Sequence, residues 1–165
     1  MRGDVGGLGA YFDDAGVNLM HDEWFDPMSA ATRALLRLAR REAPDLLLNL
    51  HSCAGPPHPQ QTDYVPMEIK QRVRELADRC YKKMDDAAIP RHGPPAVQPD
   101  QWRQSAPPPL NLTSALYHAG TELPITFEST HGVESPQTPE GVSYDALLQT
   151  HHLLFQAAAG ELATG

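Results

Sequence analysis

The sequence predicts an α/β fold in which a mostly parallel or mixed sheet is flanked by helices. Two short runs, residues 46–50 and 123–130, are apolar at most positions, as strands covered on both faces are. Longer segments before, between and after them repeat apolar residues every three or four positions, which is typical of amphipathic helices. This alternation favours a layered structure with the sheet between helices.

Length and composition limit the class of protein. The 165 residues fit one domain, 1–165, and the shares of hydrophobic residues (41%) and charged residues (21%) are ordinary for a globular chain. The net charge of −8 argues against a surface that binds nucleic acid or anionic membranes. No apolar stretch reaches the roughly 20 residues of a membrane span. No secretory signal or disulfide framework is visible, so we expect a cytoplasmic protein without nucleic-acid or membrane partners.

The N-terminal third of the chain predicts a loop followed by a helix. Residues 1–25 are rich in Gly and Asp, which indicates a loop with a short strand at 17–19. The helix is expected to begin at Asp26 as its cap, with Pro27 in the first turn, and to end before Pro44. The residues expected on its inner face are Met28, Ala31, Leu35 and Leu38.

Loops, helices and one strand are predicted over the remainder. A proline-dense loop over 51–65 precedes a helix that begins at Pro66, and the segment 90–109 is expected to be a proline-rich surface loop or insertion. A short helix ends at Gly120, and a last helix covers 143–163. The expected inner faces are Ile69, Val73, Leu76, Ala77, Cys80 and Met84 in the earlier long helix and Leu147, His151, Leu154 and Ala158 in the last.

Each predicted strand delivers an ionisable side chain just before a turn, His51 in one and Glu128 in the other. Ligands of open α/β sheets bind at the carboxyl ends of the strands, so the two side chains could face one cleft. In such a cleft one of the two side chains could act as a metal ligand and the other as a general base. Position alone favours a structural role, since buried His and Glu are often simply hydrogen-bonded.

Two stretches carry motifs in the order of a known family. They are GVNLMHDEWFDPMSAATRALLRLARREAPDLLLNLHS and YHAGTELPITFESTHG, and together they resemble the zinc metallocarboxypeptidases, the family of carboxypeptidase A. The resemblance covers most of residues 14–160. It implies a zinc-carboxypeptidase-like fold, His51 as the third zinc ligand, and Glu128 as general base on a zinc-activated water. The implied activity is hydrolysis of peptide or amide bonds, with such a peptide or amide as substrate.

The family's His-x-x-Glu motif, which supplies the other two zinc ligands, is not found before Gly16. The one His-x-x-Glu in the chain, His131 to Glu134, follows Glu128, and we interpret it as coincidental because it is out of order. Catalytic zinc needs three protein ligands. We therefore expect either the C-terminal portion of a longer enzyme, incomplete at the N-terminus and partnered by the missing segment, or a degenerate relative.

The residues for substrate binding also depart from the family. Met20 and His21 stand where the family's Asn-Arg pair grips a terminal carboxylate, and neither offers the bidentate fork of arginine. An amidase or deacylase of the same superfamily therefore stays open, as does a catalytically inactive relative that binds a peptide or protein partner. Arg2, near the family's oxyanion-stabilising arginine, and Tyr117, a pocket candidate, join His21 as the residues considered for substrate binding.

Overall fold

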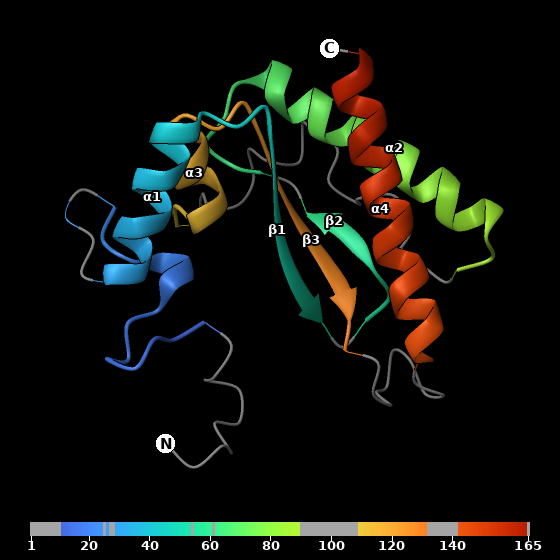
Figure 1. Ribbon diagram of the computed structural model, residues 1–165, viewed down its shortest axis with the longest axis horizontal. Coiled ribbons are helices and arrows are strands. Elements are labelled where there is room, and N and C mark those ends of the chain that lie inside the picture. The colour runs from blue at the N-terminus through green and yellow to red at the C-terminus, as the bar shows by residue number, and fades with distance from the viewer. Residues whose placement is uncertain are drawn as a thin grey trace, which may run out of the picture.

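The computed structural model of the protein describes residues 11–24, 26, 29–53, 55–60, 62–89, 109–131 and 142–164. Over these residues the chain forms an α/β structure, a small mixed sheet with helices against both faces (Figure 1). None of the described helices is both long and apolar enough to cross a membrane.

The sheet has three strands in the order β1-β3-β2. Strand β1 (Leu46–Cys53) runs parallel to β3 (Leu123–Thr130), and β2 (His58–Gln60) pairs antiparallel with the other side of β3. The two predicted strands are thus confirmed as parallel neighbours. Strand β2 was expected to be loop; it has only three residues and contains a proline, which a sheet tolerates at an edge because the missing N–H faces away from the ladder.

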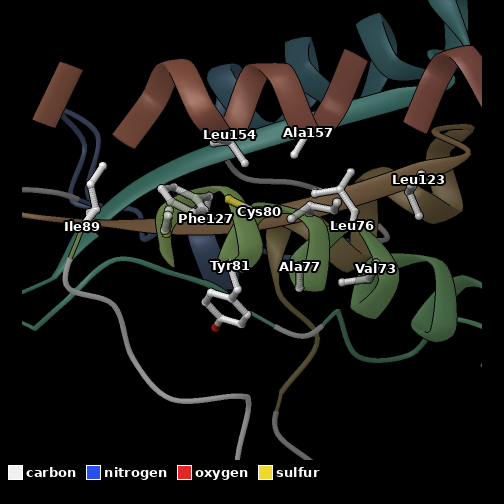
Figure 2. Packing of buried hydrophobic residues seen from close by; sticks show 12 residues of the cluster. Val73, Leu76, Ala77, Cys80, Tyr81, Ile89, Leu123, Phe127, Leu154 and Ala157 are labelled. Carbon is white, nitrogen blue, oxygen red and sulfur yellow. The ribbon is translucent and has the colours of Figure 1, made fainter. Parts of the chain in front are cut away.

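Helices α2 (Met67–Asp86) and α4 (Tyr144–Thr164) cover one face of the sheet and enclose the larger core. Phe127 of β3 lies between them, near Cys80 of α2 and Leu154 of α4 (Figure 2). All three side chains are fully buried. The apolar stripes predicted for these two helices are the stripes that pack inward.

Helices α1 (Ala30–Glu42) and α3 (Leu112–Ala119) cover the other face around a smaller cluster of apolar side chains. The inner face predicted for α1 is wrong: Leu35 is 38% exposed and Leu38 47%, whereas Thr32 and Ala39 are buried. A Cβ placed on Gly120 would lie 3.5 Å from the carbonyl oxygen of Ala39. The stripe that packs inward combines Thr32 and Ala39 with Leu36, which is partly buried against the same cluster.

The start of α1 also differs from the expectation. Its N-cap is Ser29, whose hydroxyl accepts a hydrogen bond from the backbone N–H of Ala31 at 3.1 Å, and not Asp26. The buried carboxylate of Asp22 accepts from the backbone N–H of Ser29 at 3.1 Å and so fixes the cap. Ahead of it, the strand expected at 17–19 is reduced to one β-bridge and a 3-10 helix, η2 (Leu19–His21).

The C-terminal elements follow the prediction closely. Helix α3 ends at Gly120, which adopts a φ of 130° that side chains rarely reach, and α4 begins one residue after the expected start. The proline-rich segment expected over 90–109 lies almost wholly outside the described residues.

Candidate functional site

The parallel pairing of β1 and β3 brings His51 and Glu128 together. The two residues are direct partners in the register of the strands, and their side chains point to the same face of the sheet. Nδ1 of His51 lies 3.7 Å from Oε1 of Glu128, and the two side chains are only 9% and 7% exposed. The structure therefore confirms that the two strand-end residues are neighbours, as the carboxyl ends of adjacent parallel strands allow.

The two oxygens of the Glu128 carboxylate have different surroundings. Oε1 accepts a hydrogen bond from the side-chain amide of Gln60 at 2.9 Å. Oε2 is buried and has no hydrogen-bond partner among the described residues. Burial raises the pKa of Glu128, and the nearby His51 and His131 oppose part of that rise. A carboxyl group with a raised pKa is a stronger base once it is ionised.

His51 stands beside a second aromatic residue. The hydroxyl of Tyr11 lies 3.5 Å from Nδ1 of His51, and the two rings are tilted by 49° with centroids 5.4 Å apart. Burial lowers the pKa of His51, although the charge of Glu128 acts in the opposite direction. Burial, followed by the charge of Glu128, raises the pKa of Tyr11. The lowered pKa of His51 favours the neutral imidazole, which is the form that accepts a proton or binds a metal ion.

An open hollow of about 930 Å³ adjoins this pair. Its lining residues are Tyr11, Leu19, Met20, Asn49, Leu50, His51, Ser52, Leu112, Ser129, His131 and His151. Glu128 is not among them, so the imidazole of His51 is the member of the pair that faces the hollow. A ligand in the hollow would therefore meet His51 first, with the carboxylate behind it.

A polar network supports β1 next to the hollow. The side-chain amide of Asn49 donates to the hydroxyl of Thr113 at 2.9 Å, and that hydroxyl lies 2.6 Å from the hydroxyl of Thr126. Both threonines are buried. The network joins α3 to both parallel strands, so the floor of the hollow is held by hydrogen bonds as well as by packing.

The residues considered for substrate binding do not gather at the hollow. The exposed ring of His21 has Nδ1 3.4 Å from the carbonyl oxygen of Leu110 and does not line the hollow, whereas the preceding Met20 does. Tyr117 packs edge-on against the ring of His118, on α3, and is also absent from the lining. Arg2 lies outside the described residues.

Sequence reasoning missed Tyr11 and Gln60. Tyr11 follows a glycine-rich stretch, and Gln60 ends a proline-dense one, so neither sits in a periodic pattern that marks a site. His131 was noted only as part of a coincidental motif. Its Nε2 lies 3.0 Å from the carbonyl oxygen of Ser52, which holds the turn after β3 against the end of β1.

The described residues do not by themselves fit a catalytic zinc ion. Within the described ranges, no three His, Cys, Asp or Glu side chains come close enough together to hold a metal ion. Catalytic zinc takes three protein ligands and leaves one position for water, and His51 supplies one imidazole. Comparisons with protein-family models, curated proteins and solved structures find no significant match to this chain.

Proposed function

We propose that this chain carries part of the site of a zinc-dependent hydrolase of peptide or amide bonds, of the carboxypeptidase type. The observation that carries the proposal is the buried contact of 3.7 Å between His51 and Glu128 at the carboxyl ends of two parallel strands. The resemblance of the surrounding sequence to zinc metallocarboxypeptidases supports the same roles for these two residues.

Glu128 acts as the general base in this proposal. It takes a proton from water as the water oxygen bonds to the amide carbon, and it returns that proton to the amine that leaves when the C–N bond breaks. Two properties support this role: burial raises the pKa of Glu128, and its Oε2 has no donor among the described residues. A carboxylate oxygen without a donor keeps its lone pairs free to accept a proton.

His51 acts as a zinc ligand in the same proposal, because its imidazole faces the hollow and its lowered pKa favours the neutral form. When bound, zinc would polarise the carbonyl group and activate water. Since the described residues supply only this ligand, the proposal requires two more from the residues of the chain that the structure does not describe. The complete fold would then be zinc-carboxypeptidase-like.

A second candidate is a catalytically inactive relative that binds a peptide or protein partner in the hollow. The observation that favours it is the lining itself, which pairs the apolar Leu19, Met20 and Leu112 with hydrogen-bonding groups such as Asn49. Such a mixed lining suits an extended peptide. The exposed position of His21 also keeps an amidase or deacylase of the same superfamily open, since no guanidinium replaces it among the lining residues.

The deciding experiment measures zinc binding by calorimetry and the hydrolysis of blocked dipeptides and dipeptide amides by chromatography. We compare the wild type with His51→Ala and with a matched control, His152→Ala, because His152 is exposed on α4, where its ring contacts the side-chain amide of Gln156. We expect His51→Ala to lose zinc and hydrolysis while the control keeps both. If the wild type binds peptides but neither binds zinc nor hydrolyses any substrate, the proposal is wrong and the binding module is favoured.

A further inference from the structure

Strand β2 holds Gln60 in place independently of Glu128. Gln60 pairs with Thr126 in the ladder between β2 and β3. The neighbouring Pro59 is buried, and the hydroxyl of Thr62 donates to the carbonyl oxygen of Pro124 at 2.8 Å. The proline restricts the backbone torsion just before Gln60, and the hydrogen bond anchors the chain just after it. The amide of Gln60 is therefore presented to Glu128 from a fixed backbone.

The contact between Gln60 and Glu128 distinguishes the two carboxylate oxygens. Oε1 is 2.9 Å from the amide nitrogen of Gln60 and also lies nearest to His51, whereas the buried Oε2 has no partner among the described residues. The last torsion of a glutamate side chain is broad and roughly two-fold, so without a donor the two oxygens exchange easily. A donor on one oxygen removes this freedom.

We propose that Gln60 is a positioning residue, which ties down Oε1 of Glu128 and so fixes the orientation of the carboxylate beside His51. The inference rests on the proposed function, because it assigns Gln60 a role in the same proton transfer. Loss of the amide would let the carboxylate turn away from the line of transfer. A misplacement of about 1 Å in a catalytic group can lower the rate about 100-fold.

The kinetic test replaces Gln60 by methionine, which keeps the length of the side chain and removes the N–H donors. We expect kcat to fall about 10-fold to 100-fold while KM stays within about 2-fold, because a positioning residue acts on the transfer and not on substrate binding. The matched control is Gln71→Met, which removes an exposed amide that donates to Glu75 at 3.1 Å on α2 and leaves the site untouched.

A spectroscopic test reads the contact without any activity. In the nuclear magnetic resonance spectrum of the wild type, one side-chain N–H of Gln60 is expected downfield and protected from exchange with water. In Glu128→Met, which has no acceptor, both properties are expected to vanish, while the side-chain amide of Gln71 stays unchanged. Dispersed backbone signals in each variant show that the fold is intact, so a failed fold is not mistaken for a lost contact.

The outcomes separate the inference from the proposed function. A wild type that hydrolyses its substrate beside a Gln60→Met variant of equal kcat overturns the role of Gln60 and leaves the proposed function standing. An unprotected Gln60 amide in the wild type overturns the contact itself. A wild type without hydrolysis overturns the proposed function, and the role of Gln60 in that reaction with it.

Discussion

Truncation of Phe127 to alanine is expected to lower the free energy of unfolding by about 3–5 kcal/mol, the usual cost of deleting a fully buried phenylalanine ring. Phe127 is 0% exposed, lies on the central strand, and belongs to the cluster that joins the sheet to α2 and α4. Its ring also meets the edge of His151 at a centroid distance of 6.3 Å.

The matched control is Phe155→Ala, the same truncation on the outer side of α4, where the ring is 50% exposed. We expect this change to cost at most about 1 kcal/mol, because most of its surface stays in water on folding. Phe127→Leu, which keeps most of the volume, is expected to cost roughly 1 kcal/mol.

Urea unfolding followed by far-ultraviolet circular dichroism measures all three variants, with the midpoint read at an unchanged slope. Equal losses in Phe127→Ala and Phe155→Ala would refute the reasoning, since they would mean that the larger core does not lie between β3 and the two long helices. A variant with Phe127→Ala is also expected to bind ligands at the hollow more weakly, because Glu128 is the next residue on the same strand.

Three further outcomes follow from burial and charge. Burial raises the pKa of Glu128 in the folded protein, so its ionisation lowers the free energy of unfolding as the pH rises above the ordinary pKa of 4.5. Glu128→Gln is therefore expected to be more stable than the wild type at pH 7. In urea titrations this difference in stability is expected to vanish below about pH 4. Burial raises the pKa of Cys80 to about 11, so iodoacetamide at pH 8 is expected to label Cys53 first, which mass spectrometry would detect. Equal labelling of the two cysteines in the native state would contradict the burial of Cys80. Glu161 is 7% exposed and accepts hydrogen bonds from two arginines of α2. Glu161→Gln is expected to lower the free energy of unfolding by about 1–2 kcal/mol, less than the loss of a fully buried pair, because both arginines are partly solvated. A loss that does not shrink in 1 M salt would argue against an ionic origin.

The secondary structure was predictable where one apolar stripe dominates a segment. Helix α2 carries a single stripe, and its packed side chains are those that the spacing indicates. Helix α4 also has apolar residues on its exposed side, such as Phe155, but the stripe that the spacing indicates is the one that packs inward. Helix α1 carries a stripe with Leu35 and Leu38 beside one that includes Thr32, Leu36 and Ala39, and the second one packs inward. The choice between them depends on contacts with α3, which joins α1 from far along the sequence.

The candidate site was predictable only in part, for a similar reason. That His51 and Glu128 might share a cleft followed from two strand ends, and the parallel register confirms their contact. The position of Glu128 behind His51 and its hydrogen bond from Gln60 could not be predicted. Gln60 belongs to β2, and three residues are too few to show the alternation that predicts a strand. The zinc ion and the hydrolase activity remain predictions.

The parallel pairing of β1 and β3 determines when the contact between His51 and Glu128 can form during folding. The two halves of the site meet only through pairings of long sequence separation, such as the hydroxyl of Ser129 donating to the carbonyl oxygen of His51 across 78 positions. Such contacts must overcome the entropy of closing a long loop, so they form late and only together with the core. We therefore expect no early, locally structured intermediate to contain the His51–Glu128 pair, which should form in the same step as the fold.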